Sequence, residues 1–223
     1  MKIKGAIFDM DGTLLDSMQF WEYLWQNIGE KYLADASFKP CDEINNRLRT
    51  MIFHDAMVYF RSYYKLTADT DEFIEFASTG ITRFYRDIVK PKPGAKALLE
   101  YLKGRKIKLC LASAATMDIV RYALESHDML SYFDVVLSCA DIGVGKEKPD
   151  IYRMAARLFN LSCNEVFVLE DSYVALETAR NAGFQTVGVF DKYSSGQERL
   201  QKAADIYLDE QKTLEHLISV LDA

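Results

Sequence analysis

Short apolar runs that stop abruptly at polar loops recur along the chain, and they alternate with amphipathic segments long enough for helices. The runs that we expect to be strands cover residues 2–8, 107–112, 135–137, 166–169 and 186–190. The amphipathic segments, several of which begin with Pro or with a Ser or Thr cap, cover residues 93–104, 117–127, 149–159 and 172–182. Strands that alternate with helices form a parallel sheet covered on both faces. The pattern therefore predicts an α/β fold with a Rossmann-like parallel sheet.

Residues 16–90 interrupt this alternation. They contain no clean strand, and their apolar residues recur at helical spacing in three stripes: Phe20, Tyr23, Leu24 and Ile28; Phe53, Met57, Phe60 and Tyr64; and Phe73, Phe76, Ile81, Phe84 and Tyr85. We therefore expect an inserted α-helical bundle domain over residues 16–90 and a core domain formed by residues 1–15 and 91–223. Pro91 and Pro93 have rigid φ angles and suit a hinge or linker where the chain returns to the sheet.

The composition limits what the chain can bind. Its 223 residues are 49% hydrophobic and 27% charged, which is typical of a globular protein with a well-buried core. The net charge of −6 argues against a general nucleic-acid binder, because such proteins need a basic surface to neutralise phosphates. The N-terminal apolar stretch runs straight into Asp9, unlike a signal peptide, and no segment approaches the roughly 18 apolar residues of a membrane span. We expect a cytoplasmic protein without a nucleic-acid or membrane partner.

Acidic residues follow the expected strands at the positions where each strand ends. Asp9 and Asp11 follow the first strand, and Glu170 and Asp171 follow the fourth. Ligands of an open parallel sheet bind at the carboxyl ends of its strands, so these side chains are expected to meet at one edge. A lone Asp is more often a helix cap or a solvated turn. Several carboxylates at one edge would repel each other without a hard cation, and oxygen ligands in a compact geometry favour Mg²⁺.

Other residues at the same edge suit a phosphate group. Ser113 follows the second expected strand and can offer its hydroxyl and neighbouring N–H groups to an oxyanion at a helix start. A lysine within residues 145–150 can bring a positive charge there. The chain has no GxSxG motif and no Ser–His pair, so a carboxylate is the candidate nucleophile. Asp9 is placed to attack phosphorus and form an aspartyl phosphate, which splits one hard hydrolysis into two easier steps.

Four segments resemble, in order, the four motifs of the haloacid dehalogenase-like hydrolase superfamily. Residues 8–17 read FDMDGTLLDS and resemble the first motif, DxDGT. Residues 111–113 resemble the second, Lys146 with residues 149–152 the third, and residues 170–172 with the later 179–183 the fourth. The insert between the first and second motifs resembles the helical cap of the β-phosphoglucomutase and phosphoglycolate phosphatase branch. The resemblance thus implies a core with a cap domain over residues 16–90.

The resemblance also implies a role for each motif residue. Asp9 would be the nucleophile, and Asp11 the general acid and base whose backbone carbonyl also reaches the metal. Glu170 and Asp171 would complete a Mg²⁺ site with these two residues. The implied activity is that of a Mg²⁺-dependent phosphatase. It would act on a small phosphorylated metabolite through an aspartyl-phosphate intermediate, as a monomer or weak homodimer.

Ser113 and a lysine would hold the phosphoryl group, and the choice of lysine is left open by a departure from the family pattern. The third motif usually has Lys-Pro ahead of its Pro-Asp, whereas here Glu147 follows Lys146, and Lys148 directly precedes Pro149. Counting back from the apolar residues 151–152 favours Lys146. The fourth motif normally has Gly where Ala175 stands. The change from Gly to Ala is small enough to leave the metal site credible.

Three other functions are alternatives to hydrolysis. A phosphosugar mutase of the β-phosphoglucomutase kind is the main alternative, because residues 112–114 and 149–152 resemble that branch. The mutase branch has a His where this chain has Trp21, which favours hydrolysis. Phospho-accepting receiver domains are about half this length and have no helical cap. An idle interaction protein would not need Asp9, Asp11 and Asp171 together.

The substrate cannot be read from the sequence. Candidate contacts on the expected helical insert are Trp21, Trp25, Arg47, Arg49, His54 and Arg61. For the aromatic side chains, packing in the core of the insert is the more common role.

Overall fold

The computed structural model describes residues 3–222, and the side chains of residues 42, 46, 49 and 50 lie outside this description. The chain forms two compact units. The first contains the chain up to Met18 and from Lys90 onward, and the second contains Gln19–Val89.

The first unit is built on a parallel six-stranded sheet in the order β3-β2-β1-β4-β5-β6. Its strands are β1 (Gly5–Phe8), β2 (Lys108–Ser113), β3 (Val135–Ser138), β4 (Val166–Glu170), β5 (Gln185–Val189) and β6 (Ile206–Leu208). Strands β1 and β4 are buried along their whole length, as expected for strands covered on both faces. The prediction of a Rossmann-like parallel sheet is confirmed. The edge strand β6 was not expected from the sequence.

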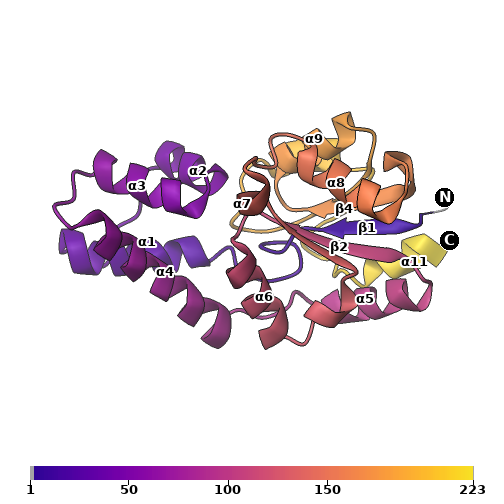
Figure 1. Cartoon of the computed structure of the whole chain (residues 1–223), viewed down its shortest axis with the longest axis horizontal. Helices are drawn as coiled ribbons and strands as arrows, with labels where there is room; N and C mark the ends of the chain where they lie inside the picture. The colour runs from indigo at the N-terminus through magenta and orange to yellow at the C-terminus, as the bar shows by residue number, and fades with distance from the viewer. Residues whose placement is uncertain (1–2, 223) are drawn as a thin grey trace. The chain divides into compact units, whose positions relative to one another are not determined.

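Helices cover both faces of this sheet, with α8 and α9 on one side and α5, α6 and α11 on the other (Figure 1). The helices are α5 (Ala95–Gly104), α6 (Met117–Ser126), α7 (Cys139–Ile142), α8 (Asp150–Phe159), α9 (Tyr173–Asn181), α10 (Gln197–Ala203) and α11 (His216–Asp222). Helix α8 is strongly amphipathic and buries Ile151, Tyr152 and Phe159 against Ile7 and Val168 of the sheet. Burying a large apolar side chain stabilises a fold by about 1.5–3 kcal/mol.

The second unit is helical, with α1 (Phe20–Ile28), α2 (Asp42–Thr50), α3 (Phe53–Tyr63), α4 (Thr70–Asp87) and a π-helical turn over Gly29–Leu33. The aromatic residues of the three predicted stripes form much of its core. Trp25 stacks on Phe60 with ring centroids 4.9 Å apart, and Phe60 stacks on Phe73 at 6.0 Å. Helix α4 begins at a side-chain cap, because Asp69 accepts hydrogen bonds from the backbone N–H groups of residues 71 and 72.

The chain leaves the first unit and returns to it at neighbouring points. The Asp16 N–H donates to the carbonyl of Lys90 at 2.9 Å, and the Lys92 N–H donates to the carbonyl of Leu14 at 2.8 Å. Leu15 and Pro91 form an isolated antiparallel bridge between these hydrogen bonds. The segment with the prolines is therefore fixed to the loop after β1. Among the described residues, no helix combines the length and the apolar character needed to cross a membrane.

Candidate active site

Strands β1, β2 and β4 end at one edge of the sheet, and polar, buried residues stand at or directly after their ends. In the sheet register, Phe8 of β1 pairs with Leu111 of β2 and with Leu169 of β4. The strands are parallel, so Asp9, Ser113, Glu170 and Asp171 all reach this edge, and each is at most 7% exposed. Polar groups this deeply buried need partners, which makes the edge the candidate active site.

Three carboxylates of this edge gather around one point. Asp9, Glu170 and Asp171 each offer a carboxylate oxygen, and these atoms all lie within 4.8 Å of one another. Burial, then the negative charges of Asp9 and Glu170, raise the pKa of Asp171 well above its ordinary range. Burial is also the main reason that the pKa of Glu170 rises to about 7. Ionisation of all three carboxylates is therefore unfavourable, and a bound divalent cation would offset their repulsion.

Lys146 brings one positive charge into this cluster. It lies in the loop before α8, and its ammonium group donates to Asp9 Oδ1 and, at 2.6 Å, to Glu170 Oε1. Burial alone would lower the pKa of Lys146, but attraction to Asp9 and Glu170 outweighs it and raises the pKa. Lys148 is exposed to solvent. When all three carboxylates are ionised, they exceed the one ammonium by two negative charges, which matches the charge of Mg²⁺.

The loop after β1 passes close to Asp171. Gly12 has φ +83°, and a Cβ atom built on it would lie 2.6 Å from Cγ of Asp171. Glycine is therefore required at this position, for both its conformation and its lack of a side chain. The same loop carries Asp11, which is half-buried and accepts a 2.6 Å hydrogen bond on Oδ1 from the hydroxyl of Ser17. Asp11 thus lies on the loop that follows Asp9, with its carboxylate oriented by Ser17.

Ser113 ends strand β2 and precedes the loop that leads into α6. Its Oγ accepts a 3.0 Å hydrogen bond from the backbone N–H of Ala115. The hydroxyl of Ser138, at the end of β3, donates to the carbonyl of Ala115 at 2.6 Å. These contacts fix the backbone N–H and carbonyl groups of Ala115, in the turn that follows Ser113.

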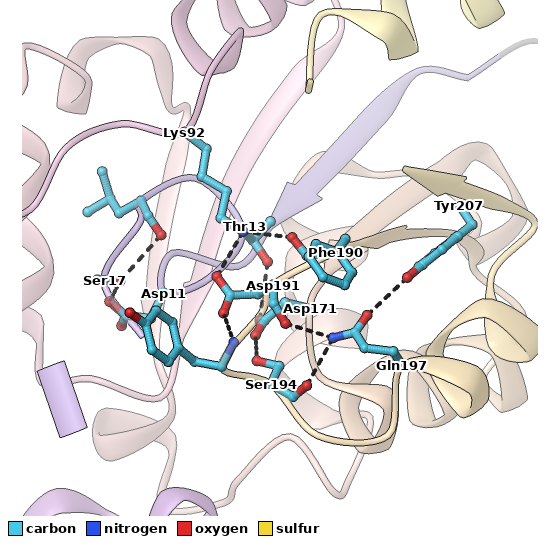
Figure 2. Close-up of polar contacts among 12 residues, drawn as sticks. Asp11, Thr13, Ser17, Lys92, Asp171, Phe190, Asp191, Ser194, Gln197 and Tyr207 are labelled. Carbon is cyan, nitrogen blue, oxygen red and sulfur yellow. Dashed lines mark hydrogen bonds and ion pairs between the residues drawn. The ribbon is translucent and has the colours of Figure 1, made fainter. Parts of the chain in front are cut away.

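Several residues for which the sequence predicted no role at the site contact the acidic residues. The hydroxyl of Tyr152, on α8, donates to Glu170 Oε1 at 2.9 Å. The hydroxyl of Ser194, in the loop after β5, donates to Asp171 Oδ2 (Figure 2). Asp191 begins that loop, and the rule that functional residues follow strand ends could have identified it. Tyr152 matched an apolar helix face, and Ser194 follows no motif, so the sequence offered no comparable indication for them.

The six candidates on the helical unit fall into different environments. Trp25 is buried and its indole N–H donates to Asn45 Oδ1 at 2.9 Å, which is a packing role. Arg61 Nε donates to the carbonyl of Ala68 at 2.6 Å and so holds a turn of the helical unit. The guanidinium of Arg47 lies 4.4 Å from the ring centroid of Tyr59. The side chain of Arg49 lies outside the described residues.

A family model for haloacid dehalogenase-like hydrolases matches residues 3–183, which includes every residue of the acidic cluster. The chain belongs to this family. The resemblance of its four motifs to the haloacid dehalogenase-like hydrolases is therefore confirmed.

Individual proteins also align over almost the whole chain. The phosphorylated carbohydrates phosphatase of Thermotoga maritima is 25% identical over 221 residues, covering 98% of this chain and 100% of the relative. A crystal structure of CbbY from Rhodobacter sphaeroides in complex with phosphate is 22% identical, with a TM-score of 0.81 and coverage of 99% and 100%. A crystal structure of β-phosphoglucomutase from Clostridium difficile is 20% identical, with a TM-score of 0.76 and coverage of 99% and 97%. At these identities the two structures establish the shared fold.

Proposed function

We propose that the protein is a Mg²⁺-dependent phosphatase that hydrolyses a small phosphorylated metabolite through an aspartyl-phosphate intermediate. The observation that carries this proposal is that buried Asp9 pairs with the ammonium group of Lys146 and offers an oxygen within 4.8 Å of carboxylate oxygens of Glu170 and Asp171. Membership of the hydrolase family and the similarity to a phosphatase of phosphorylated carbohydrates support the same activity.

Asp9 is the proposed nucleophile and Asp11 the proposed general acid and base. A carboxylate oxygen of Asp9 attacks phosphorus while the bond from phosphorus to the leaving oxygen breaks. Asp11 gives its proton to that oxygen, so the product leaves as an alcohol. Asp11 then takes a proton from the water that attacks the aspartyl phosphate, and inorganic phosphate and free Asp9 result. The hydrogen bond from Ser17 to Asp11 Oδ1 supports this role, because it orients the carboxyl group that exchanges the proton.

The acidic residues fit a bound Mg²⁺. Asp9, Glu170, Asp171 and the backbone carbonyl of Asp11 would hold the ion, because oxygen ligands and a net negative charge are what it prefers. When bound, the ion supplies positive charge that polarises the phosphoryl group. The chain's own contribution is to hold the carboxylates in place and to exclude bulk water from them.

Ser113 and Lys146 are the proposed phosphate-binding residues. Lys146 offers an ammonium group at the carboxylate that would attack, where it can offset charge on the equatorial oxygens. Ser113 offers a hydroxyl and adjoins the backbone N–H groups that precede α6. We further propose that residues 16–90 act as the cap that selects the metabolite. The net charge of −6 favours a small ligand over nucleic acid.

Chelation is expected to abolish activity and added Mg²⁺ to restore it. The reason is that three buried carboxylates at the phosphate site repel an anionic substrate unless a cation offsets their charge. The measurement is phosphate release from a panel of phosphorylated metabolites and one aryl phosphate, each with Mg²⁺, with excess chelator, and with Mg²⁺ added back. Full turnover in excess chelator would contradict the metal assignment. No turnover on any substrate with Mg²⁺ would contradict the phosphatase assignment.

A sugar 1-phosphate is expected to be hydrolysed and not isomerised. The fate of an aspartyl phosphate depends on whether water or a sugar hydroxyl attacks it. Trp21 stands where the mutase branch has His, and its ring contacts those of Phe20 and Trp25, with centroids 5.6 and 5.4 Å away. It brings no imidazole to direct the transfer. Free phosphate and 6-phosphate should be followed together in the presence of a sugar bisphosphate. Rapid 6-phosphate formation with little phosphate release would establish the mutase instead.

A further inference from the structure

The loop after β5, residues 191–197, is tied together by its own hydrogen bonds. The Ser194 N–H donates to the carbonyl of Asp191 at 3.1 Å, and the Tyr193 N–H donates to Asp191 Oδ1 at 2.9 Å. The side-chain amide of Gln197 donates to the carbonyls of Asp191 and Ser194 at 2.9 and 3.0 Å. Gln197 is in turn held by the hydroxyl of Tyr207, which donates to its Oε1 at 3.0 Å. The loop therefore has one well-defined shape, visible in Figure 2.

A buried ion pair fixes this loop to the rest of the core unit. Lys92 Nζ lies 2.9 Å from Asp191 Oδ2 and donates to the carbonyl of Phe190 at 2.8 Å. The side chains of Lys92 and Asp191 are 13% and 2% exposed. The backbone of Lys92 is itself bonded to Leu14, in the loop after β1. The catalytic steps proposed above use neither Lys92 nor Asp191, so the pair is available for a positioning role.

Ser194 is the residue that this fixed loop presents to the acidic cluster. Its hydroxyl donates to Asp171 Oδ2, while the hydroxyl of Thr13 lies farther off, 3.4 Å from Asp171 Oδ1. A hydrogen bond to one oxygen of a carboxylate restricts rotation of the group and so orients both of its oxygens. An outer partner of this kind is useful only if its own position is fixed, which the Lys92–Asp191 pair provides.

We propose that Ser194 is a positioning residue that orients the Asp171 carboxylate for cation binding, with the Lys92–Asp191 ion pair holding the loop that carries it. The proposal rests on the proposed function in one respect, because it takes Asp171 to be a Mg²⁺ ligand. The proposal assigns a role in the metal site to Ser194, which lies outside the four motifs. It also assigns a role to the Lys92–Asp191 ion pair.

Replacing Ser194 by Ala is expected to raise the Kd for Mg²⁺ by about tenfold, since loss of a partner that orients a ligand commonly costs about 10- to 100-fold in metal affinity. The probe is MgCl₂ titrated into substrate-free, metal-free protein in a calorimeter. Ser194→Thr keeps the hydroxyl and should keep the wild-type Kd. Ser195→Ala makes the same chemical change at the next, exposed residue and should also leave the Kd unchanged. Melting curves of all variants should coincide, which separates orientation from loss of fold.

Kinetics provide a second readout. Ser194→Ala should raise the Mg²⁺ concentration for half-maximal activity by the same factor as the Kd, with kcat at saturating Mg²⁺ close to wild type. A purely structural role would lower the melting temperature and kcat together. A wild-type Kd for Ser194→Ala, or an equal loss in Ser195→Ala, overturns the proposal.

Failure of this proposal and failure of the proposed function give different results. Asp171→Asn should remove Mg²⁺ binding altogether. If it does while Ser194→Ala binds like wild type, only the positioning role of Ser194 is wrong. If the wild-type protein binds Mg²⁺ and Ser194→Ala weakens that binding, but no phosphate ester is hydrolysed, only the phosphatase activity is wrong. If the wild-type protein binds no Mg²⁺, both are wrong.

Discussion

Asp9→Asn is expected to lower turnover by about 10⁴-fold or more, because an amide has nearly the shape of the carboxylate but cannot serve as the covalent nucleophile. The fold should survive the change. Asp9 lies in a cluster where its negative charge raises the pKa of both Glu170 and Asp171, so removing that charge relieves repulsion. Lys146 keeps its 2.6 Å contact with Glu170. The melting temperature of metal-free Asp9→Asn should therefore equal or exceed that of the wild type.

The measurements are steady-state phosphate release and a melting curve for each protein. Asp128→Asn makes the same substitution at a side chain that is 92% exposed and away from the cluster, and Asn tolerates the positive φ of this residue, so it should change neither quantity. Labelling by beryllofluoride gives an independent test, since the adduct should form on Asp9. Near-wild-type rates for Asp9→Asn, or an adduct on another residue, would mean that the proposed nucleophile is wrong.

Lys146→Ala is expected to lower kcat/KM by about 10²- to 10³-fold, the size of effect seen when one fixed group that stabilises transition-state charge is removed. Its ammonium group is the positive side-chain charge paired with Asp9 and Glu170. Lys148→Ala is the matched control two residues along, and it should behave like wild type because Lys148 is exposed.

Both lysine variants should be assayed at saturating Mg²⁺ and below their melting temperatures. Removing Lys146 leaves the buried carboxylates without the ammonium group that pairs with them, which lowers stability. These conditions keep a loss of stability from being taken for a loss of rate. Equal losses in the two variants would show that neither lysine alone binds the phosphoryl group. A larger loss in Lys148→Ala would transfer the role to Lys148.

Much of the fold was predictable because the spacing of apolar residues along the sequence indicates which face of a strand or helix is buried. Strand β1 lies within the expected run 2–8, and α8 begins one residue after the start of the expected segment 149–159. Strand β6 was not expected, because it has three residues, two of them only partly buried. An edge strand this short leaves too few positions for an apolar pattern.

The site residues predicted from the sequence were those at strand ends and, from its place in the third motif, Lys146. Asp9, Glu170 and Asp171 could be placed together because parallel strands end at the same edge. Tyr152 and Ser194 could not be placed, since their hydroxyls meet the carboxylates only after α8 and the loop after β5 have packed. Such contacts depend on tertiary packing, and no repeating pattern in the sequence indicates them.

The backbone hydrogen bond between Asp16 and Lys90 has a consequence for how proteins of this kind can diversify. Because the polypeptide leaves the core unit and re-enters it at adjacent points, the sheet and its acidic edge do not depend on how many residues intervene. Gene segments of different length can be inserted between these two points without changing the order of the strands in the sheet. An exchange of the helical unit, which we propose selects the metabolite, would therefore leave the strands and the acidic residues of the core unit in place.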